Sequence, residues 1–269
     1  MFDSSRSQEA PFQPTFGAQV GEHGHTRFTL WAPGAQRVDV EVEGKPSVTM
    51  SKTDDGCVTA EVACGHGAHY RYRIFADDSD HTGTLVPDPA ARAQASDIDG
   101  PSVVIDANRY QWQHTDWQGR PWHETVLYEL HIGTLGGLQG VRQRLRYLAE
   151  LGITAIELMP VSEFPGARNW GYDGVLTYAV EASYGSPDDL KALVDEAHSL
   201  GIMVFLDVVY NHFGPDGNYL ASYAGDFFRE DIVTPWGASI DFRQPMVRRY
   251  FIDNALMWLQ EYRLDGLRF

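Results

Sequence analysis

The second half of the chain alternates apolar, strand-like runs with amphipathic, helix-like segments, and this alternation limits the fold more than any other feature. Runs suited to buried strands occur in this order: VLYELHIG, ITAIELMPV, IMVFLDVVYN and LDGLRF. A helix-like segment separates each run from the next. Strands separated by helices are typical of parallel strands joined by right-handed crossovers. Periodicity alone does not choose between an open sheet and a barrel.

The helix-like segments carry their own signals. GVRQRLRYLAELG places these apolar residues on one face: Val141, Leu145, Leu148 and Leu151. In SPDDLKALVDEAHSLG, Ser186 is the expected N-cap, Pro187 is the first helical residue and Asp189 completes a capping box. The helix expected in PMVRRYFIDNALMWLQEYR presents these apolar residues: Val247, Phe251, Ala255, Leu256 and Leu259. The patterns predict three helices packed on the strands.

Residues 15–106 follow a different pattern, in which apolar and polar residues alternate within short runs bounded by Gly, Pro, Asp or Ser. Val38, Val40 and Val42 fall on one face of such a run, as a half-buried antiparallel strand requires. Several short strands at close spacing predict a β-sandwich of immunoglobulin-like type. The predicted organisation is a flexible N-terminus, a sandwich, a linker and an α/β domain, at residues 1–14, 15–106, 107–125 and 126–269.

The charge balance argues against polyanionic partners. The formal net charge is -16, whereas binding to nucleic acid or an anionic membrane needs clustered Lys and Arg. Cys57 and Cys64 are the only cysteines, too few for a disulfide framework and without a C-x-x-C metal spacing. The N-terminal residues form no signal-peptide core, and no apolar run has the length of a membrane span. The sequence therefore predicts a soluble cytoplasmic protein.

The loops that follow the predicted strands carry the candidate chemistry, because reacting groups in parallel α/β folds gather at the carboxyl ends of strands. These loops hold carboxylates, an amide, an imidazole and flat aromatic rings: Trp170, Tyr172, Asp173, Asp207, Asn211, His212 and Arg268. A sugar offers hydroxyls to polar groups and C–H faces to aromatic rings, so the mixture predicts sugar recognition. Each residue also has a structural alternative. Tyr172 could cover one end of the sheet, His212 could be a satisfied core histidine, and Asp207 could pair with Arg268.

Two strand ends carry a family resemblance. DVVYNH, which closes the third strand, and DGLRF, which closes the fourth, are similar to the first two signature regions of the α-amylase superfamily, glycoside hydrolase family 13. Within it, AIELMPVSEFPGARNWGYDGV, NHFGPDGNYL and TPWG look closest to the maltooligosyltrehalose trehalohydrolases. The resemblance runs from about residue 15 to the last residue. It implies a sandwich similar to early-set glucan-binding modules, followed by the first half of a (β/α)8 TIM barrel.

The resemblance also implies a reaction, the retaining hydrolysis of the α-1,4 bond that joins trehalose to a maltooligosaccharide, with no cofactor. It implies that Tyr172 stacks on the sugar, His212 hydrogen-bonds its hydroxyls and Asp207 anchors the local network. Arg268 would keep the neighbouring nucleophile ionised. Further expected substrate contacts are Trp170, Asp173 and Trp236. Asn211 matches a position that helps to bind calcium in many amylases, but here it is expected to be a polar scaffold residue, and no metal is predicted.

The family pattern places the nucleophilic Asp directly after Phe269, and the acid/base Glu and a stabilising Asp further on. The chain as given is therefore expected to be inactive alone and, as a half-barrel, marginally stable. Two other functions stay open, a noncatalytic α-glucan-binding protein and another amylase-family enzyme such as a glycogen branching or debranching enzyme. Maltooligosaccharide affinity without turnover would favour the first of these, and product analysis would identify the second.

Overall fold

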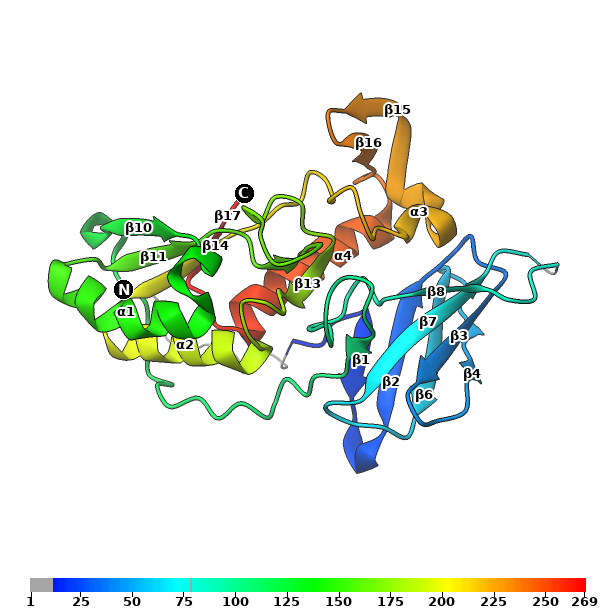
Figure 1. Cartoon of the computed structure of the whole chain (residues 1–269), viewed down its shortest axis with the longest axis horizontal. Coiled ribbons are helices and arrows are strands. Elements are labelled where there is room, and N and C mark those ends of the chain that lie inside the picture. Colours follow the sequence, from blue (N-terminus) through cyan, green and yellow to red (C-terminus); the bar gives the residue numbers. More distant parts are fainter. Residues whose placement is uncertain (1–11, 78) are drawn as a thin grey trace, which may run out of the picture.

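The computed structural model describes residues 12–77 and 79–269, which form a β part and an α/β part (Figure 1). Most of the predicted flexible segment 1–14 lies outside the described residues. None of the helices in the described ranges combines the length and the apolar character that crossing a membrane would need.

Two antiparallel sheets build the β part. One has the order β1-β2-β6-β5: Gly17–Val20, Thr26–Trp31, Cys57–Val62 and Ser51–Lys52. The other has the order β4-β3-β7-β8, with β9 also paired to β7: Val48–Thr49, Arg37–Val42, His69–Phe75, Thr84–Val86 and Ser102–Val103. Val38, Val40 and Val42 of β3 are all buried, as their alternation predicts. They join side chains of the first sheet in one apolar core.

The α/β part contains four parallel strands in the order β10-β11-β14-β17: Leu127–Leu130, Ala155–Leu158, Met203–Asp207 and Gly266–Arg268. The spatial order is therefore the chain order. A barrel adds each strand beside the previous one, whereas a dinucleotide-binding sheet changes direction after its third strand. The order favours the barrel arrangement, a choice that periodicity left open.

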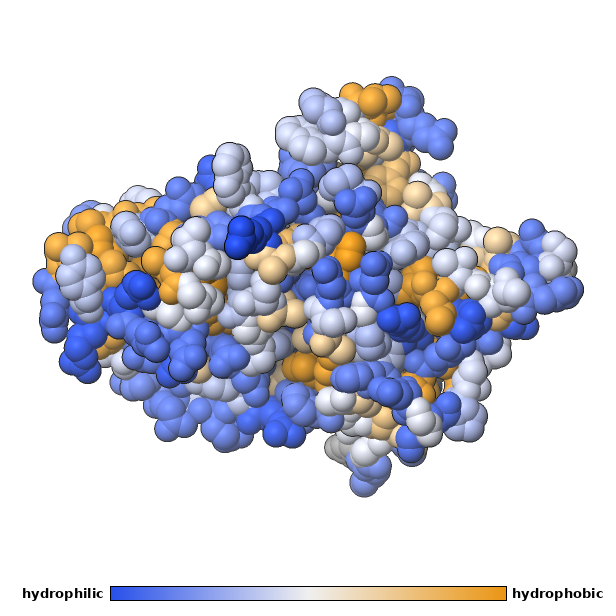
Figure 2. Space-filling view, viewed as in Figure 1, coloured by the Kyte–Doolittle hydropathy of each residue, from blue (hydrophilic) through white to orange (hydrophobic). Residues whose placement is uncertain are grey.

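The first strand of this sheet lies at its edge and exposes apolar side chains. Leu127 and Tyr128 of β10 are 44% and 45% exposed, and Val126 just before them is 51% exposed. Apolar residues gather at this end of the molecule in Figure 2. An edge strand with exposed apolar side chains offers a surface on which another strand can pack.

Helices α1 and α2 pack against each other and the sheet: Gly137–Leu151 and Pro187–Ser199. The capping box of α2 is confirmed, since Ser186 N donates to Asp189 Oδ2 at 2.9 Å and Asp189 N donates to Ser186 Oγ at 3.1 Å. In α1, three of the four predicted core residues are buried, but Leu151 is 62% exposed. Leu151 ends the helix, and Gly152 then turns the chain through a left-handed conformation (φ 94°), so Leu151 never faces the core.

The last helix differs from its prediction. It consists of the α-helix α4 and one following π-helical turn: Pro245–Leu256 and Met257–Glu261. Val247 and Phe251 are buried as predicted, whereas Leu259 is 36% exposed and Trp258 is buried. A π-helical turn contains more residues than an α-helical turn, so it rotates the later residues away from the face that a 3.6-residue period predicts.

Two short antiparallel pairs lie where the sequence pattern predicts no regular element. One pairs β12 with β13: Ser162–Glu163 and Leu176–Val180. The other pairs β15 with β16 and stands out from the α/β part in Figure 1: Phe228–Thr234 and Gly237–Ile240. Short helical turns complete the described elements: Glu22–Gly24, Trp122–Glu124, Gly133–Leu135, Leu220–Tyr223 (α3) and Gly225–Phe227.

The predicted linker, residues 107–125, is bound to the α/β part. Asp195 of α2 accepts a hydrogen bond from the His114 backbone nitrogen at 2.9 Å. Further along, Trp117 Nε1 donates to Asp265 Oδ1 at 2.7 Å. The segment is therefore a packed strap rather than a free tether.

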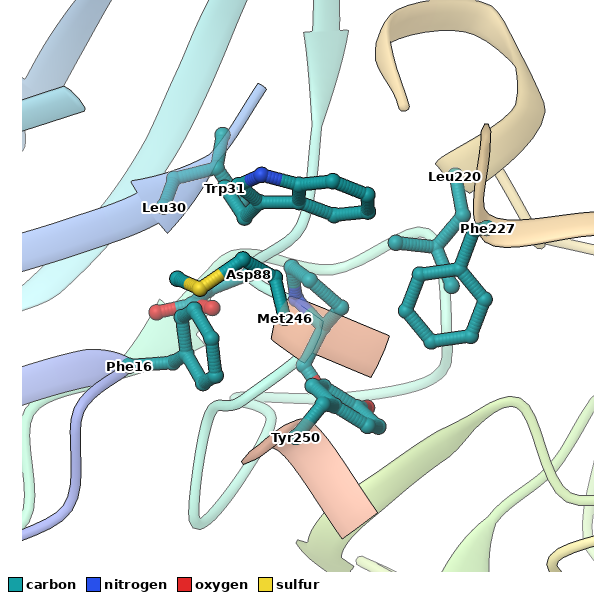
Figure 3. Close-up of a pocket in the computed structure, with 9 residues that line it drawn as sticks. Phe16, Leu30, Trp31, Asp88, Leu220, Phe227, Met246 and Tyr250 are labelled. Atoms are coloured by element: carbon teal, nitrogen blue, oxygen red, sulfur yellow. The ribbon is translucent and has the colours of Figure 1, made fainter. Parts of the chain in front are cut away.

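The two parts meet in an apolar contact, shown in close-up in Figure 3. Side chains from the β part and from the α/β part surround the same small pocket: Phe16, Leu30, Trp31, Asp88, Pro89, Leu220, Phe227, Met246 and Tyr250. Ring contacts cross the boundary, with 6.3 Å between the centroids of Trp31 and Phe227 and 6.1 Å between those of Phe16 and Tyr250. The β part thus packs directly on α3 and α4 of the α/β part.

Buried charges join the same two parts. Lys191 of α2 is 0% exposed, and its Nζ lies 3.6 Å from Glu261 Oε1. Arg92 is also buried and places Nη2 3.2 Å from Glu261 Oε2. One carboxylate therefore neutralises two buried cations, which come from different parts of the chain.

We expect Glu261→Gln to lower the free energy of unfolding by roughly 3–5 kcal/mol, because it leaves Lys191 and Arg92 buried without a counter-charge. The matched control is Glu196→Gln, which removes the half-exposed partner of Arg142 and should cost less than about 1 kcal/mol. Urea unfolding of the two variants provides the measurement. Equal losses would contradict the account.

Candidate active site

Three predicted site residues meet at the carboxyl ends of the strands. Asp207 ends β14 and lies opposite Arg268, which ends β17. Arg268 Nη1 forms an ion pair with Asp207 Oδ2, and the Tyr172 hydroxyl donates to the same oxygen at 2.8 Å. The structural alternative, that Asp207 pairs with Arg268, is therefore realised in the same cluster. The contacts that these three residues make with a sugar stay a prediction.

The protonation of Tyr172 follows from its surroundings. Burial is the largest cause that raises the pKa of its hydroxyl, and the hydrogen bond to Asp207 adds to it, while Arg268 acts in the opposite direction. The phenol therefore keeps its proton at neutral pH and acts as a donor. This bond fixes the hydroxyl end of the ring.

Two further carboxylates lie beside this cluster and were not among the predicted residues. Glu157 of β11 is 8% exposed, and its Oε1 lies 3.6 Å from Arg268 Nε. Burial raises the pKa of Glu157, and the charge of Arg268 partly offsets that effect. The second is Glu129 of β10, and carboxylate oxygens of Glu129, Glu157 and Asp207 lie within 4.8 Å of one another. Since the guanidinium of Arg268 already contacts two of these groups, we assign no metal to them.

His212 links two loops of the site. Its Nε2 lies 2.8 Å from the Tyr172 backbone oxygen, and its Nδ1 lies 3.0 Å from Asn211 Oδ1. Its ring stacks on Trp236 with 4.6 Å between centroids and 22° between planes. A carbonyl oxygen can only accept, so Nε2 carries a proton and donates. Both ring nitrogens already have protein partners, and a sugar hydroxyl would have to replace one of them.

An open cleft of about 950 Å³ lies over the loop that contains Tyr172. Its lining includes predicted residues and several that sequence reasoning missed: His131, Gly133, Thr134, Met159, Ala167, Arg168, Asn169, Trp170, Tyr172 and Asp173. Among the missed ones, His131 follows β10, and its Nε2 lies 2.6 Å from the Asn169 backbone oxygen. A polar residue near the carboxyl end of the predicted run VLYELHIG was the signal that could have identified it.

The remaining predicted residues lie around this cleft. Trp170 is 78% exposed and Trp236 is 58% exposed, so each offers ring surface to a ligand. The carboxylate of Asp173 accepts a hydrogen bond from Asn169 Nδ2 at 2.8 Å. Trp170 and Asp173 line the cleft, whereas Trp236 reaches the site from the β15/β16 turn through His212.

Relatives of known name match most of the chain. A malto-oligosyltrehalose trehalohydrolase from Deinococcus radiodurans is 46% identical over 246 residues, which cover 90% of this chain and 40% of that protein. A 1,4-alpha-glucan branching enzyme from Photobacterium profundum is 35% identical over 272 residues, covering 90% of this chain and 37% of the enzyme. The chain thus spans less than half the length of these relatives.

Solved structures agree with the fold. A crystal structure from Salmonella typhimurium, provisionally assigned as an alpha amylase, superposes with a TM-score of 0.91 at 46% identity, covering 96% of this chain and 44% of the other. A pullulanase variant from Paenibacillus barengoltzii, complexed with maltotetraose, gives a TM-score of 0.82 at 25% identity over 96% of this chain and 48% of the other.

The family model that matches is the catalytic domain of alpha amylase, over residues 76–226. The matched segment includes β10, β11 and β14, the cleft loop and most of the polar side chains described above. Together with the strand order and the Tyr172–Asp207–Arg268 cluster, this match identifies the family. The chain belongs to the alpha-amylase family.

Proposed function

We propose that the chain forms the glucan-binding half of the catalytic domain of a glycoside hydrolase that acts on maltooligosyltrehalose and releases trehalose. The observation that carries this proposal is the cluster of Tyr172, Asp207 and Arg268 beside an open, aromatic-lined cleft. The name of the Deinococcus relative supports the substrate, and the maltotetraose complex of the pullulanase supports the wider class of α-glucans.

In this proposal the ring of Tyr172 stacks on one glucose unit at the cleavage position. About half of the Arg268 side chain is exposed. The guanidinium can therefore neutralise a carboxylate nucleophile while its ion pair with Asp207 holds Arg268 in place. Trp170 and Trp236 provide apolar surface for neighbouring sugars, and Asp173 provides an acceptor for their hydroxyls. No metal or organic cofactor is needed for these contacts.

We further propose that residues 15–106 form an immunoglobulin-like sandwich that supports the barrel rather than binding glucan itself. In the described part of this range, Leu85, at 37%, is the one large apolar side chain classed as exposed. Stacking on sugars requires exposed aromatic rings, and the sandwich presents its aromatic residues to its own core or to the α/β part. This observation weighs against a noncatalytic protein that binds glucan through its sandwich.

The substrate class can be tested by calorimetric titration of the purified chain. Maltooligosyltrehalose should bind more tightly than a linear maltooligosaccharide with the same number of glucose units, because the trehalose end would occupy part of the site. A branched α-glucan is the third ligand. Tighter binding of the branched glucan would instead favour a branching or debranching enzyme, and an absence of binding to all three would overturn the proposal.

Tyr172 can be tested with two substitutions. Tyr172→Ala removes the stacking ring and should weaken maltooligosaccharide binding by about two- to tenfold, since aromatic stacking contributes about 0.5–1.5 kcal/mol. Tyr172→Phe keeps the ring and removes only the bond to Asp207, so its loss in affinity should be smaller. The affinities are measured by the same titration.

Trp122→Ala is the control for this series, because Trp122 is 72% exposed but lies before β10, away from the cleft residues. It should leave the affinity unchanged. If Tyr172→Ala and Trp122→Ala behaved alike, Tyr172 would have no stacking role.

A further inference from the structure

The loop that carries Trp170, Tyr172 and Asp173 starts from β12 and returns along β13. Two glutamates lie at its base: Glu163 ends β12, and Glu181 follows β13 directly. Each is only 1% exposed. Buried carboxyl groups are uncommon unless they are paired or hydrogen-bonded, and neither residue belongs to the proposed sugar contacts.

Each of these carboxyl groups holds the backbone next to the other. Glu181 Oε2 accepts a hydrogen bond from the Phe164 nitrogen at 3.2 Å, directly after Glu163. In return, Glu163 Oε2 accepts a hydrogen bond from the Ala182 nitrogen at 2.9 Å, directly after Glu181. The Ser183 nitrogen also donates to Glu181 Oε1 at 2.9 Å. The pair therefore cross-links the two ends of the cleft loop.

The groups around the pair add negative charge. Asp97, from the loop before β9, contributes repulsion to both carboxyl groups, and its Oδ2 accepts a hydrogen bond from the Gly166 nitrogen at 2.9 Å. Tyr184 lies nearby, and its pKa of about 12 keeps it neutral. Among the described residues, no Lys, Arg or His forms an ion pair with Glu163 or Glu181.

Burial raises the pKa of Glu163 to about 8, and the charge of Glu181 adds to this effect. Burial also raises the pKa of Glu181, while its hydrogen bonds to backbone nitrogens lower it. With no cation beside them, two ionised carboxylates would repel each other across the base of the loop. A proton on one of them removes this repulsion and preserves the backbone hydrogen bonds.

We propose that Glu163 and Glu181 are positioning residues, that one of the two carboxyl groups is protonated at neutral pH, and that loss of this proton to solvent loosens the loop that binds glucan. The role of the loop rests on the proposed function, but the proton itself can be detected without any glucan. Loss of the proton in alkaline solution would therefore weaken glucan binding.

The sign of the stability effect follows from the raised pKa of Glu163. In the unfolded chain this carboxyl group ionises near the ordinary glutamate pKa of 4.5, whereas in the folded protein it keeps its proton up to about pH 8. Between these two values the folded state binds more protons than the unfolded state, so its stability falls as the pH rises. Above about pH 8 the contribution of Glu163 no longer changes.

Two measurements without glucan test the pair. In carbon-13 NMR, the carboxyl carbon of Glu163 should titrate near pH 8 in the full chain, and a midpoint near 4.5 would overturn the proposal. Glu163→Gln cannot ionise but can still accept from Ala182. Its melting temperature should therefore rise relative to that of the wild type between about pH 5 and pH 8.

The matched control is Glu150→Gln on α1, which replaces an exposed glutamate. It should show no pH-dependent difference from the wild type in this range. If Glu163→Gln also kept a constant offset from the wild type, the proton would have no effect on stability and the proposal would fail.

Titration with a maltooligosaccharide tests the loop. If glucan binding raises the pKa of Glu163 by one unit, the affinity of the wild type should fall by about fivefold between about pH 7 and pH 9, while Glu163→Gln should keep its affinity. Equal pH dependence in both proteins would overturn the link to the loop. An absence of glucan binding at every pH would contradict the proposed function instead, and NMR and melting would still decide whether the pair shares a proton.

Discussion

The candidate site depends on a single buried carboxylate. Asp207 receives the guanidinium of Arg268 from the neighbouring strand and the hydroxyl of Tyr172 from the cleft loop. Because β14 ends at Asp207 and β17 ends at Arg268, the register of these two strands sets the geometry of the site. A charge that is buried and paired has little freedom to move, so the hydroxyl end of Tyr172 is positioned by the sheet itself.

Much of this fold can be read from its amino-acid pattern, because the signals are local. Alternating valines place one face of β3 in the core, and Ser186 with Asp189 marks the start of α2. The pattern fails where geometry departs from the ideal period. Leu151 lies at a helix end, and Leu259 lies within a π-helical turn, so both are exposed although their spacing predicts burial.

The site was partly predictable for a related reason. Tyr172, Asp207 and Arg268 lie at strand ends or on the loops that follow them, where parallel folds gather polar groups. Glu157 lies within an apolar strand. Glu163 lies in a β pair that the sequence pattern does not predict, and Glu181 directly follows that pair. Their importance comes from side chains that are distant in sequence but adjacent in space. Residues of this kind emerge only when the tertiary structure is known.

The strap between the two parts, residues 107–125, limits where the chain can accept inserted residues. Asp265 accepts hydrogen bonds from Trp117 of the strap and from the Val204 nitrogen of β14, and it lies three residues before Arg268. The segment that connects the β part to the α/β part is therefore tied to the residue just before β17, the strand that supplies the guanidinium of Arg268. An insertion in this strap would therefore act like an insertion in a core element. The added residues would displace Trp117 from Asp265 and so disturb the start of β17, whereas a free linker would accommodate them without changing the rest of the fold.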